Sequence, residues 1–190
     1  MPMAAERKRA DARRNAQNLL EAAAAAFVAS GVDAPVRDIA ARAGVGMGTI
    51  YRHFPTRADL IIAVYEHQVE ACAAAGADLL ESNTSPHAAL TAWIDQFVDF
   101  LVTKHGLAAA LQSDSARFDT LHAYFIDRLV PVCTTLLEAA AAAGEIEPGI
   151  EPLGFLRAIG NLCIGSDDER YDARKMVGLL VHGLRAERLT

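Results

Sequence analysis

Apolar residues recur along most of the chain at spacings of three and four, which is the period of an amphipathic helix. Ala16, Leu20, Ala23 and Phe27 mark the first such face, in a segment from about residue 11 to residue 30. The strict alternation of apolar and polar residues that indicates a strand is nearly absent. The pattern therefore predicts an all-α protein of about nine helices.

The second and third predicted helices are short and are separated by only three residues. Val36, Ile39 and Ala40 begin the apolar face of the second, and Gly44 lies just past its end. The third is predicted from about Met47 to His53. Because only glycine enters the left-handed region without steric cost, Gly44 predicts a tight turn between two helices that cross.

A fourth, long helix is predicted over residues 57–80. Thr56 precedes it and Asp59 follows three residues later, which is a capping box. Later apolar stripes predict helices over residues 86–101, 107–111, 118–140, 152–164 and 167–185. Pro131 lies inside the 118–140 stripe, where its missing amide and its ring predict a kink.

Two short helices joined by such a turn form a helix-turn-helix. Val45 and Ile50 are expected to fill the junction between them, with Gly46 as the N-cap of the third helix. The helical period then leaves most other side chains of the third helix directed outward, and Gly48 lets its backbone come close to a partner. An outward face with hydroxyls, a cation and a histidine suits a phosphate-lined groove.

Charge is distributed unevenly over the 190 residues. The net charge is -6, yet residues 1–57 hold nine basic and five acidic residues, a charge of +4, and the remainder carries -10. A basic head on an acidic chain indicates that one part alone faces phosphate. No apolar run is long enough to span a bilayer and no signal sequence follows the basic start, so we expect a cytoplasmic protein with no membrane partner.

The stretch "VRDIAARAGVGMGTIYRHFPTRADLI" resembles the amino-terminal DNA-binding domain of the TetR family of transcriptional regulators. The elements "DIAxxAGV", "GTxYxHF" and "xxRxxL" occur in order over about residues 11–65. The basic cluster Arg7, Lys8 and Arg9 predicts a disordered tail at residues 1–10. The resemblance implies a helix-turn-helix DNA-binding domain at 11–57, and an effector-binding and dimerisation domain at 58–190. It implies a repressor that binds a palindromic double-stranded DNA operator as a homodimer and releases it on binding a small-molecule effector.

The resemblance also implies roles for single residues. Arg37 falls where a side chain of the second helix reaches a base or phosphate, and Arg57 where a cation clamps phosphate. Pro35 and Gly46 replace a threonine and a serine that are usual in the family, which removes two hydroxyl contacts. The predicted DNA-binding residues are Arg37, Met47, Gly48, Thr49, Tyr51, Arg52, His53 and Arg57.

Aromatic residues of the acidic part predict an effector pocket between helices, with ordinary core packing as the competing interpretation. Arg128 and Asn161, polar residues in largely apolar helices, are candidates for orienting the ligand. The predicted lining is Trp93, Phe97, Leu101, Leu121, Tyr124, Phe125, Arg128 and Asn161.

Dimerisation is expected because one short recognition helix covers few base pairs, whereas two half-sites about 34 Å apart give far greater specificity. The resemblance implies that helices 152–164 and 167–185 pair with their symmetry mates. The predicted interface residues are Leu156, Ile159, Gly160, Met176, Leu180, Gly183 and Leu184.

Other classes of function find little support in the sequence. A helical small-molecule carrier with a vestigial helix-turn-helix is the main alternative, since glycines occupy positions 46 and 48. The three cysteines are far apart, and Cys72 points away from His67 and Glu70 on a helix, so we expect no metal site. A small helical enzyme would have to use His105, Asp114 or His122, but their spacing defines no shared face. No catalytic motif is present, and we expect neither an enzyme nor a cofactor.

Overall fold

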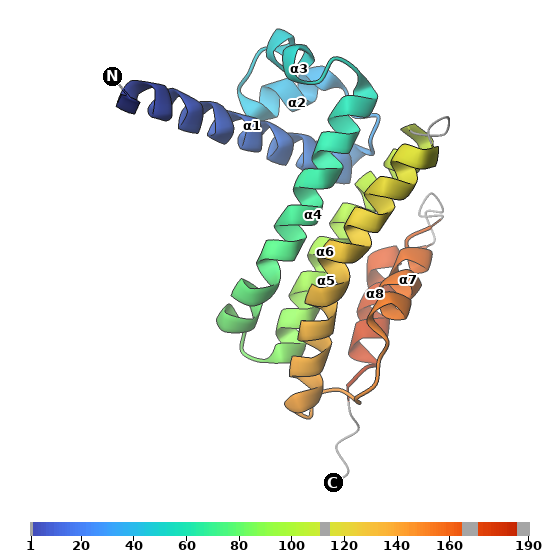
Figure 1. Cartoon of the computed structure of the whole chain (residues 1–190). Helices are drawn as coiled ribbons and strands as arrows, with labels where there is room; N and C mark the ends of the chain where they lie inside the picture. Colours follow the sequence, from blue (N-terminus) through green and yellow to red (C-terminus); the bar gives the residue numbers. More distant parts are fainter. Residues whose placement is uncertain (1, 111–114, 165–170, 186–190) are drawn as a thin grey trace. The chain divides into compact units, whose positions relative to one another are not determined.

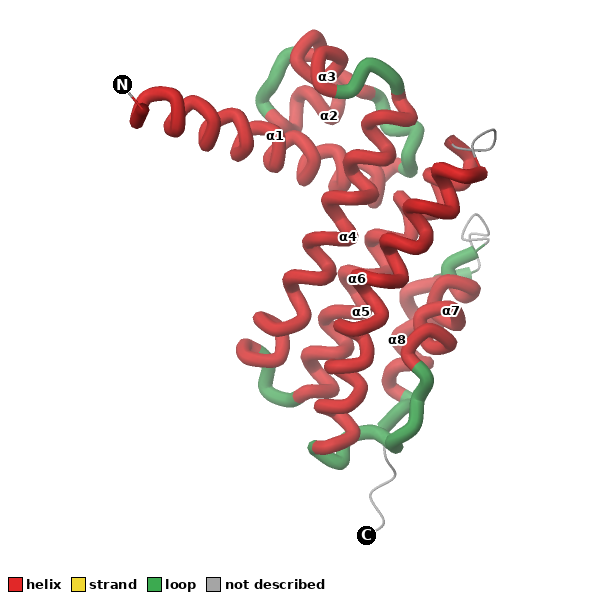
Figure 2. Tube along the Cα trace, viewed as in Figure 1, coloured by secondary structure: helices red, strands yellow, loops and turns green. Residues whose placement is uncertain are grey.

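The computed structural model describes residues 2–110, 115–164 and 171–185; its described side chains begin at Arg14 and leave out residues 102 and 107–115. Within these ranges the chain is helical and no strand occurs (Figures 1 and 2). The described residues form eight helices: α1 (Pro2–Ser30), α2 (Val36–Ala43), α3 (Met47–His53), α4 (Arg57–Ser82), α5 (Pro86–Ala110), α6 (Ser115–Ala142), α7 (Pro152–Leu162) and α8 (Ala173–His182). The all-α prediction is confirmed.

The count differs from the nine predicted helices because α5 is one element. The segments expected at 86–101 and 107–111 are joined through Gly106, although glycine disfavours a helix interior. A side chain at Gly106 would collide with Val32, so glycine is present here for close packing and does not end the helix. Helix α6 likewise continues through Pro131, whose predicted kink does not end it.

The amino terminus also departs from the prediction. Residues 2–10, expected to be a disordered tail, form the first turns of α1. Proline is well tolerated at the first helical position, and the alanines and charged residues that follow favour helix. The expectation of disorder rests on the charge of Arg7–Arg9 alone, and helix propensity is the stronger signal.

The chain divides into two compact units, which we describe separately. The first unit contains residues 1–68 and 102–115. Its core includes Phe27, Ile39 and Ile50, each 0 to 1% exposed, so α1, α2 and α3 all contribute to one apolar centre. Burial of these large side chains fixes which face of the short α3 is left for solvent.

The second unit contains residues 69–101 and 116–190. Its core is aromatic: the rings of Trp93 and Phe97 stack with centroids 5.9 Å apart, and Phe97 and Phe100 lie 6.0 and 5.7 Å from Phe125. Separations of this size are favourable for aromatic pairs. The stack joins α5 to α6 within this unit.

Candidate nucleic-acid interface

The turn between α2 and α3 has the predicted geometry. Gly44 adopts φ 66° and ψ 29°. These angles lie in the left-handed region, which glycine enters without steric cost. The Val45 amide donates to the Ala40 carbonyl at 3.0 Å, which satisfies a carbonyl at the end of α2. Ala40 is buried, as a close crossing of two helices requires.

Helix α3 begins at a glycine cap. Gly46 has extended backbone angles, as an N-cap should, and supplies no side-chain acceptor. A Cβ placed on Gly46 or on Gly48 would meet nothing within 4 Å. The fold of the chain therefore does not require glycine at either position, and the bare backbone of this turn is open to an external partner.

The outward face of α3 carries large exposed side chains. Met47 is 51% exposed and Tyr51 is 53% exposed, whereas Ile50 is 1% exposed. Tyr51 is therefore not part of the buried core that Ile50 joins. Of the other predicted contact residues on this helix, Gly48, Arg52 and His53 are exposed and Thr49 is half-buried.

Arg37 lies on α2 with its side chain 77% exposed. Its Nε donates to Asp38 Oδ1 at 3.2 Å. Exposed ion pairs of this kind contribute little free energy in water, so an approaching phosphate can compete for the guanidinium. Arg37 is thus available on the same unit as the exposed face of α3.

Arg57 begins α4 as predicted, but its side chain is directed at the protein's own backbone. Its guanidinium donates to the carbonyl oxygens of Val32 and Ala34, the latter at 2.7 Å, and sits 5.2 Å from the centre of the Phe27 ring. Burial lowers the pKa of this guanidinium from its ordinary value, with the nearby Asp33 carboxylate acting in the opposite direction. Arg57 therefore fastens α4 to the α1–α2 loop, and the role of phosphate clamp does not fit its position.

The predicted capping box at the start of α4 is confirmed. The Thr56 amide and hydroxyl donate to Asp59 Oδ2 at 3.0 and 2.7 Å, and the Asp59 amide donates back to the Thr56 hydroxyl at 3.1 Å. Such reciprocal bonds satisfy amides that a helix terminus leaves without partners. The start of α4 is thereby fixed in the first unit.

Five predicted effector-pocket residues are buried in the second unit. They come from α5 and α6 and are 0 to 7% exposed: Trp93, Phe97, Leu101, Leu121 and Phe125. The Trp93 indole donates to the Cys72 carbonyl at 2.8 Å, which joins α5 to α4. Of these five, Trp93, Phe97 and Phe125 form one stack, and the lining of an effector pocket stays a prediction.

The polar residues expected to orient a ligand lie elsewhere. Asn161 is exposed on α7, and Arg128, with its side chain 46% exposed, binds Glu70 of α4 in two hydrogen bonds. Tyr124, expected to line the pocket, also donates to Glu70. Glu70 was not predicted as part of a site, although Tyr124 and Arg128 are four residues apart on one helical face and could have indicated a shared acidic partner.

The structure of the two carboxy-terminal helices differs from the predicted dimer interface. Leu156 and Ile159 are buried in the chain's own core, as are Val177 and Val181, which the sequence analysis did not single out. Helix α8 begins at the N-cap Asp172, so the expected start near residue 167 falls within residues 165–170, outside the described residues. Apolar surface remains on the exposed Ile164 and Leu179 and on the half-buried Met176, Leu180 and Leu184; Gly160 is half-buried and Gly183 exposed.

The cysteines have the character of buried thiols. Burial raises the pKa of Cys72 and of Cys133 to about 12, which makes both unreactive at neutral pH. Among the described residues, no group of three or more histidine, cysteine or acidic side chains is arranged to hold a metal ion. None of the helices in the described ranges is long and apolar enough to cross a membrane.

Family models match both parts of the chain. The model for bacterial regulatory proteins of the tetR family matches residues 19–64, and that for the C-terminal domain of SbtR-like transcriptional regulators matches residues 85–186. The second match alone covers more than half of the chain.

Solved structures agree with these matches. The chain is similar to the TetR transcriptional regulator SCO0520 from Streptomyces coelicolor, with 35% identity, a TM-score of 0.74, and 90% of this chain and 99% of that chain covered. It is similar to a TetR regulatory protein from Mycobacterium vanbaalenii, with 31% identity, a TM-score of 0.66, and 94% and 99% covered. A TetR-family regulator from Agrobacterium tumefaciens, at 18% identity and a TM-score of 0.61 over 92% and 99%, shares the fold.

The geometry of the turn and the exposed face of α3 agree with the first family model, and the matches extend over the second unit. Members of this family regulate transcription by binding DNA and are not enzymes. The chain belongs to the TetR family of bacterial transcriptional regulators.

Proposed function

We propose that this protein is a ligand-responsive repressor that binds a palindromic operator as a homodimer in the cytoplasm. The observation that carries the proposal is the outward face of α3, where Met47 and Tyr51 are more than half exposed beside a turn of bare glycines. Large side chains held in solvent on a basic unit suit contact with a DNA groove.

Roles within the operator complex follow from position. Met47, Gly48 and Thr49 lie in the first turn of α3 and meet bases and sugars in the major groove. Tyr51 and His53 donate to backbone phosphates, with Arg52 beside them. Arg37 adds a cation from α2, and Arg57 contributes by fixing the start of α4.

A homodimer places two α3 helices on successive half-sites. The apolar surface that remains on α8 and just after α7 and α8 is where we place the interface, through Met176, Leu180 and Leu184 together with Leu179 and Ile164. Obligate interfaces are rich in such residues. Gly160 and Gly183 lie on or directly after the same two helices.

The effector binds in the second unit, among the aromatic residues of α5 and α6. Helix α4 contributes residues 57–68 to the first unit and the rest of its length to the second. A movement of α4 on effector binding therefore transmits the change from the second unit to the DNA-binding unit. Coupling requires that the effector bind the free dimer more tightly than the operator complex. The ligand is expected to be largely apolar, because the lining is.

Fluorescence anisotropy with a labelled duplex from upstream of the protein's own coding sequence tests DNA binding. Arg37→Ala and Tyr51→Ala should each weaken binding about tenfold or more, since each removes a phosphate or base contact from both half-sites. Arg117→Ala, which removes an exposed arginine of α6, is the matched control and should bind as the native chain does.

A native chain that binds no DNA but carries a small molecule, detected by native mass spectrometry, would instead indicate the carrier with a vestigial helix-turn-helix. Effector response has its own test: a bound ligand should lower operator affinity. Equal ligand affinity for the free and the operator-bound dimer would contradict the proposed release.

A further inference from the structure

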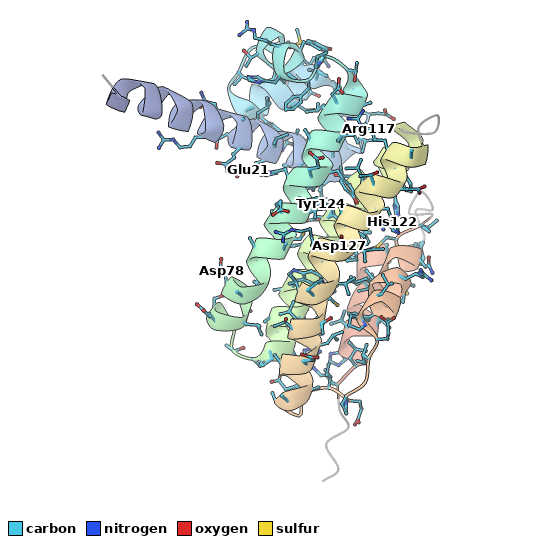
Figure 3. All side chains as sticks on the ribbon, viewed as in Figure 1. Glu21, Asp78, Arg117, His122, Tyr124 and Asp127 are labelled. Carbon is cyan, nitrogen blue, oxygen red and sulfur yellow. The ribbon has the colours of Figure 1, made fainter. Side chains whose placement is uncertain are left out.

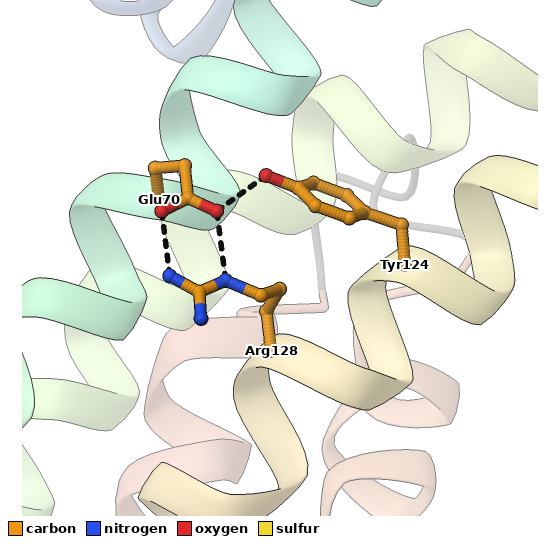
Figure 4. A network of polar contacts seen from close by, with 3 residues as sticks. All are labelled: Glu70, Tyr124 and Arg128. Atoms are coloured by element: carbon orange, nitrogen blue, oxygen red, sulfur yellow. Dashed lines mark hydrogen bonds and ion pairs between the residues drawn. The ribbon is translucent and has the colours of Figure 1, made fainter.

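Three side chains form a polar cluster between α4 and α6 of the second unit (Figure 4). Arg128 donates from Nε to Glu70 Oε1 at 2.8 Å and from Nη2 to Glu70 Oε2 at 2.6 Å, and the Tyr124 hydroxyl also donates to Oε1. Tyr124 and Arg128 are four residues apart on α6, so one face of that helix presents both donors to one carboxylate. Figure 3 shows the side chains on the whole ribbon and labels Tyr124 on α6.

The cluster is exposed, which sets it apart from ordinary packing. The Arg128 and Glu70 side chains are 46% and 49% exposed. Ion pairs in water are weak as a rule, although a two-bonded arginine–carboxylate pair with an added hydroxyl is among the better ones. The cluster is therefore a contact that can form and break without unfolding the unit.

The other attachments of α4 in this unit are of a different kind. The Trp93 indole, 0% exposed, donates to the Cys72 carbonyl, and a side chain at Gly76 would collide with Val132 of α6. These contacts are buried or steric, and breaking them costs packing. Among these three attachments of α4, the Glu70 cluster alone is charged and open to water.

Glu70 also has a particular place along α4. It comes two residues after Gln68, where the contribution of α4 to the first unit ends. A bond at this point fixes the rotation of α4 at the position where the helix enters the second unit. Small changes in that rotation would be carried along the helix.

We propose that Glu70, Tyr124 and Arg128 form a polar latch that holds α4 on α6 in the arrangement that binds the operator. The inference rests on the proposed function, and it assigns to these three residues a positioning role. Without the latch, α4 adopts more than one arrangement, and only a fraction of the protein is able to bind DNA. The apparent affinity is then the intrinsic affinity multiplied by that fraction.

Charge exchange provides the main test. Glu70→Arg and Arg128→Glu should each weaken binding to the upstream duplex about three- to fivefold, the range expected for an exposed pair, while the double exchange restores affinity to within about twofold. Asp99→Asn is the matched control, because it removes another exposed carboxylate–arginine pair of the same unit, in which the partner of Asp99 is Arg174 of α8 and not a residue of α4. Its affinity should equal that of the native chain.

Hydrogen exchange gives a readout that does not depend on DNA. In Glu70→Gln, the amides of α4 around residues 69–75 should exchange about threefold faster than in the native chain, whereas those of α8 should not change. Unaltered exchange at α4 would overturn the latch. Unaltered operator affinity in both single variants, or a double exchange that restores nothing, would overturn its role in binding.

The two failures can be told apart. A native chain that binds no DNA contradicts the proposed function, and hydrogen exchange then still decides whether the cluster holds α4. A native chain that binds DNA, together with Glu70 and Arg128 variants that bind equally well, contradicts the latch alone. The native chain is therefore measured beside every variant.

Discussion

The two compact units are organised by interactions of different range. In the first, the features that form the interface are local: Gly44 turns the chain, Gly46 caps α3, and Thr56 with Asp59 closes the start of α4. In the second, the determining contacts join residues far apart, such as Glu70 with Arg128, 58 positions later. Local chemistry thus fixes the shape of the DNA-facing surface, whereas long-range packing decides how the second unit is held.

The largest effect should come from the aromatic core of the second unit. Phe97 is 1% exposed and stacks on Trp93 and Phe125. Phe97→Ala should therefore lower the free energy of unfolding by about 3–5 kcal/mol. Trp93 is the only tryptophan of the sequence, and its fluorescence during urea unfolding reports on this unit. A loss well under about 1 kcal/mol would indicate that Phe97 borders open space, as a pocket lining does.

The next largest loss in the free energy of unfolding is expected from Arg57 in the first unit. Arg57→Met keeps the length of the side chain but removes two hydrogen bonds to carbonyls and the contact with Phe27. The change should cost about 1–3 kcal/mol. Circular dichroism during urea unfolding measures the loss. The salt dependence of DNA binding should keep its slope, whereas a phosphate clamp would lower the slope by about one per contact.

Two glycines of the helix-turn-helix provide a matched pair. Gly44 lies in the left-handed region, so Gly44→Ala places a Cβ there and should cost about 1–2 kcal/mol. Gly48 lies within α3 and faces open space. Gly48→Ala should therefore leave the free energy of unfolding unchanged or raise it by about 0.5–1 kcal/mol, because alanine favours helix. Equal losses in the two variants, measured by urea unfolding, would show that the geometry of the turn is not what holds α2 and α3.

The contrast between local and long-range contacts also explains what the sequence could predict. The bounds of α2 and α3, the turn at Gly44 and the capping box agree with the structure, because each depends on a few neighbouring residues. The inward turn of Arg57 was not predicted, since its carbonyl partners at Val32 and Ala34 are set by how α1 and α4 pack. The sequence shows that position 57 carries a cation, but it does not show whether the side chain points toward solvent or toward the protein's own backbone.

The second unit was predicted in outline only. Apolar periodicity identified the buried aromatic residues but overlooked Val177 and Val181, and it placed Leu156 and Ile159 on a dimer surface although they lie in the chain's own core. The helical period of apolar residues indicates that one face of a helix is buried. It does not indicate whether another helix of the same chain or a second subunit buries that face. The same limit applied to Arg128, whose partner Glu70 lies on another helix.

The smallest expected effect concerns pH, and it separates the latch from a titrating switch. The hydrogen bond from Arg128, followed by that from Tyr124, lowers the pKa of the Glu70 carboxylate below its ordinary value near 4.5. A carboxylate with a lowered pKa stays ionised above that value, so its contribution is lost only as the pH falls through the lowered pKa. Between about pH 6 and 8 the ratio of operator affinities of the native chain and Glu70→Gln should therefore be constant, as measured by anisotropy. A ratio that changes within this range would mean that another titrating group controls the contact between α4 and α6.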